Sequence, residues 1–116
     1  MRLFCCALLV ALTGCELLDA KACTDISIPG IRVTVLDSLT GNPLNTGDVH
    51  VVVRDGTYAD STRATEAWLA YDRTGTYTVQ VIAPGYRLWQ RSNVRVRTEE
   101  SGCHVETVDL LARLQP

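Results

Sequence analysis

The stretch GTYTVQVIAPGY, residues 75–86, decides the fold class of this chain. Its first part alternates apolar with polar side chains, which is the period of a β-strand with one buried face. The apolar side chains are Tyr77, Val79 and Val81. The Ala-Pro-Gly-Tyr that follows suits a type II turn, because Pro84 fixes φ at the second position and Gly85 accepts a positive φ at the third. Residues 75–86 therefore predict a strand that ends in a chain reversal.

Four other segments repeat the alternation, and turn signals stand between them. The alternating segments are residues 31–35, 49–53, 94–97 and 103–107, and turns are indicated at Thr40-Gly41-Asn42-Pro43, Arg54-Asp55-Gly56 and Thr74-Gly75. Short strands between such turns favour an all-β, antiparallel sandwich over alternating βα units. In residues 61–71 (STRATEAWLAY) we expect a short strand or turn, followed by a strand through Trp68 and Tyr71.

Length and charge limit the classes of protein. A chain of 116 residues has room for one domain with a real core. Charged residues make up 21% of it, with mixed signs and a net charge of -2. This composition indicates neither a basic surface for nucleic acid nor an acidic tail.

The first residues have the features of a signal peptide. Arg2 supplies a positive charge, and residues 3–12 form an apolar run that is far shorter than the roughly 20 residues a membrane-spanning helix needs. The run ends in Leu12-Thr13-Gly14-Cys15. This word resembles the lipobox of bacterial lipoproteins, an aliphatic residue and two small ones before a cysteine.

The lipobox resemblance implies that Cys15 carries diacylglycerol, that the chain is cut just before it, and that its new amino terminus is acylated. Two or three acyl chains anchor a protein durably, at about 0.8 kcal/mol per buried methylene. Glu16 differs from the aspartate that retains some such lipoproteins in the inner membrane, which favours the periplasmic face of the outer membrane. The alternative is a secreted protein in which Cys15 pairs with another cysteine.

The chain has five cysteines, and the lipobox reduces the possible pairings. Cys5 and Cys6 would leave with a signal peptide of residues 1–14, and Cys15 would carry lipid. Cys23 and Cys103 remain, and in an oxidising compartment they allow one intramolecular disulfide. The alternative is two buried free thiols. Residues 15–28 are expected to be a short tether and residues 29–116 the folded domain.

Three stretches together resemble a carboxypeptidase regulatory-like domain. They are RVTVLDSLTGNPLNTGDVHVVVRDG (32–56), RTGTYTVQVIAPGYRLWQRSNVRV (73–96) and CHVETVDLLARL (103–114). The matching marks are Asp37, Thr40-Gly41, Pro43-Leu44, Gly75-Thr76-Tyr77 and Pro84-Gly85-Tyr86. The resemblance implies a seven-stranded, transthyretin-like β-sandwich of prealbumin-like, Ig-like type. It also implies an accessory role in binding, spacing or stabilisation, among which fold alone does not choose.

The sequence lacks the motifs of enzymes that have related sandwich folds. The iron site of intradiol dioxygenases uses two closely spaced histidines, whereas His50 and His104 are far apart and are expected to be solvated or to face a neighbouring strand. The hydroxyisourate hydrolases end in Tyr-Arg-Gly-Ser, whereas this chain ends in residues 113–116, Arg-Leu-Gln-Pro. We therefore expect no catalytic residues, no metal site and no cofactor.

One segment combines arginine with aromatic side chains. A candidate binding face for sugar or protein consists of Arg87, Trp89, Arg91, Arg95 and Arg97. The alternative is a polar sheet face with Trp89 packed at its edge. In that case Arg95 and Arg97 would pair across strands with Glu99, Glu100 or Glu106.

These patterns predict a lipid-anchored, non-enzymatic protein of the bacterial cell envelope. Its expected partners are the membrane, through the anchor, and an envelope protein or carbohydrate, with no role in nucleic-acid binding. The alternatives are a small hydrolase or metal enzyme with a site assembled from loops, and a secreted carrier or inhibitor without an anchor.

Overall fold

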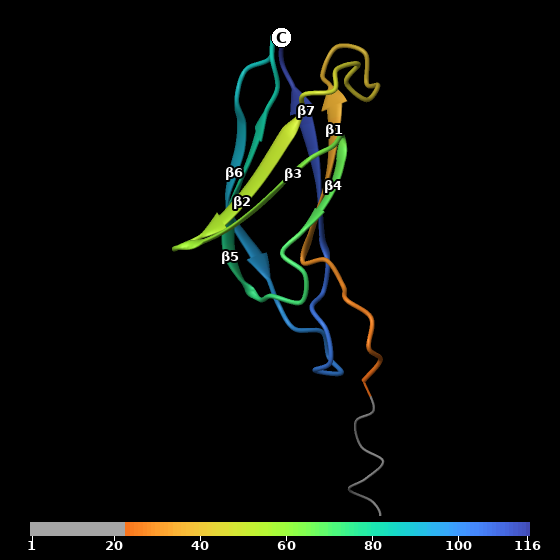
Figure 1. The fold of residues 1–116 in the computed structure, drawn as a ribbon, viewed down its shortest axis with the longest axis vertical. Coiled ribbons are helices and arrows are strands. Elements are labelled where there is room, and N and C mark those ends of the chain that lie inside the picture. Colours follow the sequence, from red (N-terminus) through yellow and green to blue (C-terminus); the bar gives the residue numbers. More distant parts are fainter. Residues whose placement is uncertain (1–22) are drawn as a thin grey trace, which may run out of the picture.

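The structure is a computed structural model that describes residues 23–116 (Figure 1). The predicted signal peptide, Cys15 and residues 16–22 of the predicted tether lie outside the described residues. The described residues form seven strands and no helix. The strands are β1 (Ile31–Asp37), β2 (His50–Asp55), β3 (Tyr58–Arg63), β4 (Glu66–Leu69), β5 (Gly75–Ile82), β6 (Trp89–Val96) and β7 (Val108–Leu114). Across residues 23–116 there is accordingly no helix that could span a bilayer.

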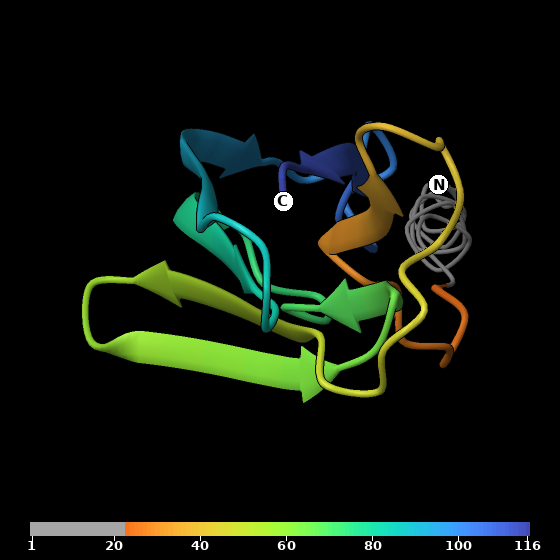
Figure 2. The same cartoon turned by 90° about the horizontal axis from the view of Figure 1, so that it is seen from above.

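The seven strands form two sheets that lie against each other (Figures 1 and 2). One sheet has the order β4-β1-β7 and the other the order β3-β2-β5-β6. Four of the five strand pairs are antiparallel, but β1 and β7 are parallel. The prediction of a purely antiparallel fold is therefore wrong at this pair. Parallel neighbours need a long connection, and here most of the domain connects β1 to β7.

The core lies between the sheets and contains the apolar side chains of every strand except β3, from which Tyr58 packs partly buried against it. Alternation along β1 and β5 confirms the predicted period, since every second side chain is buried. The largest fully buried side chains are Tyr77, Ile31, Leu69 and Leu114. The valines predicted to face inward on β1, β2, β5 and β6 are all buried, so these four segments are confirmed as strands.

The strand predicted over residues 103–107 is wrong. That segment belongs to a loop with a single bridge between Thr98 and Val105, and the last strand begins at Val108. Leu110, Ala112 and Leu114 supply the buried face of β7. Of residues 103–107 only Val105 is buried in the core, so the alternation there does not produce a strand with a buried face.

The less regular stretch at residues 61–71 is extended, as expected. It contains the end of β3 and all of β4, which begins at Glu66. Trp68 belongs to β4, but the strand stops at Leu69 and does not reach Tyr71. The reason is local, since Ala70 and Asp72 have positive φ values of 55° and 47°.

The turn that ends β5 is confirmed and is connected to the end of β1. The Tyr86 backbone N–H donates to the Ala83 carbonyl at 3.1 Å, and Gly85 has φ of 83°. The Tyr86 hydroxyl donates to Asp37 Oδ2 at 2.6 Å. Backbone N–H groups of Leu39 and Thr40 donate to Asp37 Oδ1, at 2.7 and 3.1 Å. Asp37 therefore joins two turns that are 49 residues apart in the sequence.

This contact changes the pKa of both partners. The hydrogen bond from Tyr86, followed by that from the Leu39 N–H, lowers the pKa of Asp37. The same bond raises the pKa of Tyr86, because it favours the protonated phenol beside a carboxylate.

Arg73 fastens the other end of β5 to the β2–β3 hairpin. Its Nη1 donates to Asp55 Oδ2 at 3.1 Å and to the Tyr77 hydroxyl at 3.0 Å. Its guanidinium lies 3.9 Å from the centre of the Tyr58 ring. A Cβ at position 75 would meet the carboxylate of Asp55, so a larger residue there would displace the side chain that Arg73 holds.

Candidate functional site

The predicted arginine and tryptophan face does not form one face in the structure. In the β5–β6 pair Trp89 is opposite Val81 and Arg91 is opposite Val79. Since side chains opposite each other share a face, Trp89 and Arg91 lie on the core side of the sheet margin. Arg95 lies on the other side, because it alternates with the buried Val94 and Val96.

A bulge in β6 causes this division. The pairing passes from Val79 opposite Arg91 to Tyr77 opposite Val94, which places one extra residue in β6. Asn93 lies in this stretch with φ of 58°. The sequence carried a signal of the bulge, because Trp89 and Val94 are an odd number of positions apart and an unbroken strand cannot turn both inward.

Each member of the predicted face has a local role. Trp89 packs partly buried against the core, and the Arg91 guanidinium lies 5.3 Å from the centre of its ring. Arg87 lines a hollow of about 160 Å³ at the carboxyl-terminal end of β7. Arg95 and Arg97 line a different hollow, of about 350 Å³, beside the start of β5.

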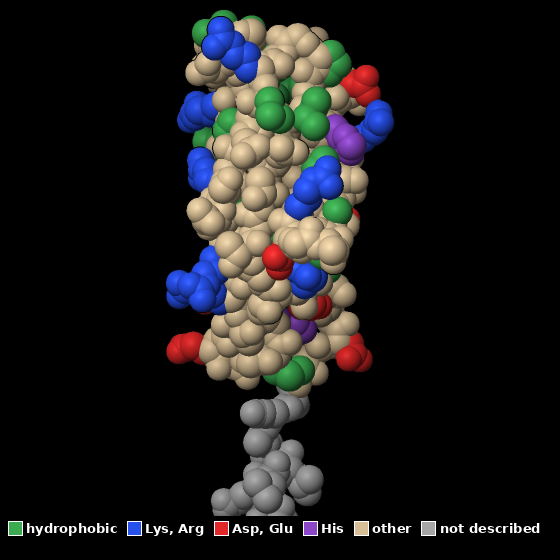
Figure 3. Space-filling model, turned by 90° about the vertical axis from the view of Figure 1, so that its left-hand side faces the viewer, with side chains coloured by type: hydrophobic (Ala, Val, Ile, Leu, Met, Phe, Trp, Pro, Cys, Tyr) green, Lys and Arg blue, Asp and Glu red, His purple; other side chains and the backbone are tan. Residues whose placement is uncertain are grey.

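Arg95 and Arg97 form no ion pair within residues 23–116, so the alternative in which they pair with Glu99, Glu100 or Glu106 is not found. In Figure 3, which faces the left-hand side of Figure 1, basic side chains lie mostly along the margins of the molecule and do not gather at the centre. β6 is one of the two edge strands of its sheet. Charged side chains on such a strand discourage pairing with another chain.

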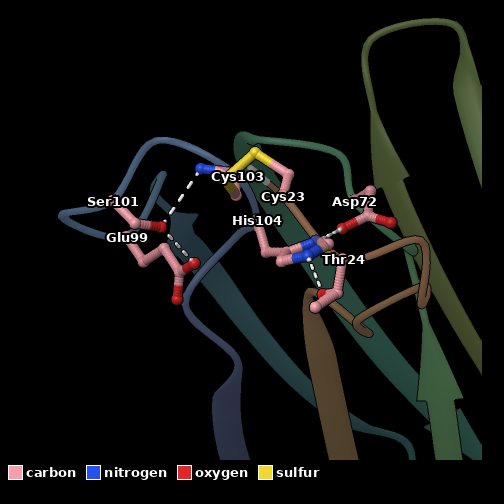
Figure 4. Close-up of a disulfide and its surroundings, with 7 residues drawn as sticks. All are labelled: Cys23, Thr24, Asp72, Glu99, Ser101, Cys103 and His104. Carbon is pink, nitrogen blue, oxygen red and sulfur yellow. Dashed lines mark hydrogen bonds and ion pairs between the residues drawn. A yellow bond between two sulfur atoms is a disulfide. The ribbon is translucent and has the colours of Figure 1, made fainter. Parts of the chain in front are cut away.

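The Cys23–Cys103 disulfide is present, with Cα atoms 5.4 Å apart (Figure 4). It fastens residue 23 to the loop between β6 and β7. Ser101 supports the loop, since its hydroxyl donates to Glu99 Oε1 at 2.6 Å and accepts the Cys103 backbone N–H at 3.2 Å. The disulfide thus ties the amino-terminal segment to the end of the domain.

Beside the disulfide, Asp72, His104 and Thr24 form a hydrogen-bonded row (Figure 4). His104 Nδ1 lies 3.3 Å from Asp72 Oδ1, and His104 Nε2 lies 3.1 Å from Thr24 Oγ1. The His104 side chain is only 14% exposed, so the expectation of a solvated or cross-strand histidine is wrong here. His50 does lie on a strand, opposite Arg63 of β3. The row was not predicted because its members are far apart in the sequence.

A groove on the outer face of the three-stranded sheet is the largest of the hollows described here, at about 420 Å³. Arg32 of β1 lies between Trp68 of β4 and Asp109 of β7 in one cross-strand row. Arg32 Nε donates to Asp109 Oδ1 at 2.7 Å. The groove is lined by Ser27, Pro29, Arg32, Trp68, Tyr71, Thr107 and Asp109.

The groove combines aromatic rings with a balanced pair of charges. Trp68 is 50% exposed and Tyr71 is 45% exposed, although such rings usually bury most of their surface. No motif in the sequence indicates this site. Its one local signal was Trp68 on the polar phase, between the buried residues Ala67 and Leu69.

Metal-binding geometry is not found in the described part of the chain, where no three His, Cys, Asp or Glu side chains are grouped to hold an ion. Comparison of the chain with models of protein families finds no match, and comparison with curated proteins finds none either. A functional assignment therefore depends on the residues of this chain.

Proposed function

We propose that the protein is a lipid-anchored, non-enzymatic binding or structural module of the bacterial cell envelope. The observation that carries the proposal is the pairing of its cysteines. The disulfide uses Cys23 and Cys103, the two that remain once residues 1–14 and Cys15 are assigned to processing. A disulfide that closes a long loop favours an oxidising compartment, and the lipobox supplies a reason for the odd fifth cysteine.

The fold we propose is the prealbumin-like, Ig-like sandwich of carboxypeptidase regulatory-like domains. Its support is the arrangement of two sheets with three and four strands around one core. The Asp37–Tyr86 hydrogen bond adds a physical reason for the sequence marks, because it joins the Thr40-Gly41 turn to the Pro84-Gly85 turn. Modules of this kind serve as binding or spacing units.

The disulfide also limits the distance between membrane and domain. Residues 23–28 of the predicted tether are attached to the domain, through the disulfide and through Asp72, whose N–H donates to the Ile28 carbonyl at 2.8 Å. Only the eight peptide steps from Cys15 to Cys23 remain. At roughly 3.3–3.6 Å each, they reach at most about 30 Å. The domain would therefore lie close to the membrane surface.

Membrane fractionation of a Cys15→Ser variant tests the proposal. We expect the wild-type protein in the membrane fraction, released only by detergent and labelled by radioactive palmitate. The variant should lose the label and processing at residue 15. Cys6→Ser, within the signal peptide, is the matched control and should behave like the wild type. Equal solubility of the wild type and Cys15→Ser without detergent would contradict the anchor and favour the secreted alternative.

A small hydrolase is a second candidate, favoured by the row Asp72, His104 and Thr24. A carboxylate, an imidazole and a hydroxyl in this order can activate the hydroxyl as a nucleophile. The same contacts also fasten the amino-terminal segment, which is the role we assign to them. Hydrolysis of nitrophenyl acetate by the purified protein, lost in both His104→Ala and Thr24→Val, would establish the enzyme. Stoichiometric iron or zinc in the purified protein would contradict a pure binding module and favour the metal-enzyme alternative.

A further inference from the structure

We propose that the groove between β4, β1 and β7 binds a neutral saccharide, with Trp68 and Tyr71 as stacking platforms and Arg32 and Asp109 as hydrogen-bonding partners. This inference deepens the proposed binding function and rests on it. It concerns the outer face of the three-stranded sheet, on which Arg32, Trp68 and Asp109 form one row.

The size of the groove suits a small ligand unit. Its volume of about 420 Å³ lies within the range of roughly 300–1,000 Å³ that is common for small-molecule sites. A protein partner would instead need about 1,200 Å² or more of buried surface. On this face the half-exposed apolar side chains are Trp68, Tyr71 and, further along β7, Leu111 at 42% exposure. These features favour one or two sugar rings over a flat protein surface.

The backbone that carries the two aromatic residues has a defined conformation. Ala67 and Leu69 are buried on either side of Trp68, so the strand directs its side chain outward. Tyr71 lies between Ala70 and Asp72, both of which have positive φ. Such a conformation is unfavourable for a residue like alanine and often occurs at functional sites.

Several hydrogen bonds maintain this unusual backbone. The Ala70 N–H donates to Asp60 Oδ2 at 3.0 Å, and the Ala70 carbonyl accepts the Gly30 N–H at 3.0 Å. The Asp72 N–H donates to the Ile28 carbonyl at 2.8 Å. The backbone at Tyr71 is thus fixed before a ligand binds, which lowers the entropic cost of binding.

The polar groups of the groove match hydroxyls better than a charged ligand. Arg32 and Asp109 balance each other's charge, and their hydrogen bond uses only Nε and Oδ1. A guanidinium carries five N–H donors and a carboxylate two acceptor oxygens, so both can also bind vicinal hydroxyls. The Thr107 hydroxyl donates to the Pro29 carbonyl at 2.7 Å, which joins two parts of the groove wall. Sugars present an apolar C–H face and a rim of hydroxyls, which is the complement of this arrangement.

Tryptophan fluorescence provides a direct test, because the chain has two tryptophans. In the full-length Trp89→Phe variant only Trp68 emits, and in Trp68→Phe only Trp89 emits. The probes are cellobiose, maltose and diacetylchitobiose, with sodium glucuronate as the charged comparison. We expect at least one neutral disaccharide to change the emission of Trp68 with saturation, and to leave that of Trp89 unchanged.

Binding by calorimetry then tests the individual residues. Trp68→Ala and Asp109→Ala should each weaken binding at least tenfold, while Arg95→Ala, on the other sheet, should leave it unchanged. Several outcomes would overturn the saccharide site: no saturable response to any neutral disaccharide, an equal response from Trp89, or tighter binding of glucuronate. Concentration-dependent dimerisation that Trp68→Ala abolishes would assign the groove to a second copy. None of these would alter the result with Cys15→Ser, so the anchor and the ligand are tested separately.

Discussion

Trp68 and Trp89 each lie beside an arginine on a strand, yet the structure gives them opposite surroundings. Trp68, opposite Arg32, is half exposed at the groove on the three-stranded sheet. Trp89 packs against the core, with the Arg91 guanidinium 5.3 Å from its ring centre. Arg32 is paired with Asp109, whereas Arg91 contacts a ring.

The difference teaches that residue type and sequence proximity do not define a binding face in a β protein. The segment around Trp89 is richer in arginine, but a bulge turns its side chains to two sides of the sheet. The groove around Trp68 takes its residues from three strands and from three segments next to them. Strand pairing brings these residues into one row, and it acts over distances that no short motif spans.

The largest effect is expected from removing the disulfide. The bond closes a loop with a sequence separation of 80, for which the chain-entropy relation gives about 4.5 kcal/mol. Cys23→Ser combined with Cys103→Ser should lower the free energy of unfolding by roughly that amount in urea titrations. Reduced wild type should match the double variant, and an unchanged midpoint would contradict the prediction. The variant should also weaken binding at the groove, because the segment after Cys23 supplies Ser27 and Pro29 to its wall.

Alanine at each tryptophan tests the comparison itself. Trp89→Ala removes a ring packed on the core and should lower the free energy of unfolding by about 2 kcal/mol. This is somewhat less than the loss expected when a fully buried ring is removed. Trp68→Ala should change stability by no more than about 0.5 kcal/mol, since its ring is half exposed. Urea unfolding of both variants measures the difference. Equal costs would show that Trp68 is structural and would remove the contrast.

The Tyr86→Phe variant tests whether the loop before Trp89 only stabilises the fold and plays no part in binding. The Asp37 pKa is lowered below its ordinary 3.8, so its contribution to stability is present above pH 3.8 and is lost as the pH falls through the lowered pKa. The Tyr86 pKa is raised above 10.0, so its contribution is present below pH 10.0 and is lost at higher pH.

The stability gap between wild type and Tyr86→Phe should therefore be widest between these limits and close on both sides. Unfolding measured across pH gives this profile. Saccharide binding should stay unchanged, because Tyr86 lies outside the groove. A gap that does not vary with pH would show that the hydroxyl acts without Asp37.

The smallest effect is expected from the ion pair of the groove. The side chains of Arg32 and Asp109 are 47% and 62% exposed, so solvent screens their attraction. A double-mutant cycle of Arg32→Ala and Asp109→Ala should give a coupling of no more than about 1 kcal/mol to folding, and less at high salt. A larger and salt-independent coupling would assign the pair to structure and not to ligand binding.

Much of the fold was predictable because alternation and turn chemistry are local. Tyr77, Val79 and Val81 alternate within a few residues, and Pro84-Gly85 fixes the reversal that follows. The parallel pairing of β1 with β7 was not predictable in this way. The direction of a strand next to its neighbour depends on how the sheets pack, and not on the local sequence of either strand. Residues 103–107 were wrongly predicted as a strand, because a short alternation of apolar and polar residues can also occur in a loop.

The sequence by itself determined the all-β class, most of the strand positions and the turn after β5, because each follows from period or backbone preference. The Cys23–Cys103 disulfide was predicted only with the help of the lipobox resemblance, which assigns the other three cysteines to processing. The tertiary structure alone decided the groove and the row beside the disulfide. Arg32, Trp68 and Asp109 come from three strands, and Asp72, His104 and Thr24 from three separate segments. Local preferences place side chains on one or the other face of a strand, but only packing of the sheets determines which distant side chains meet.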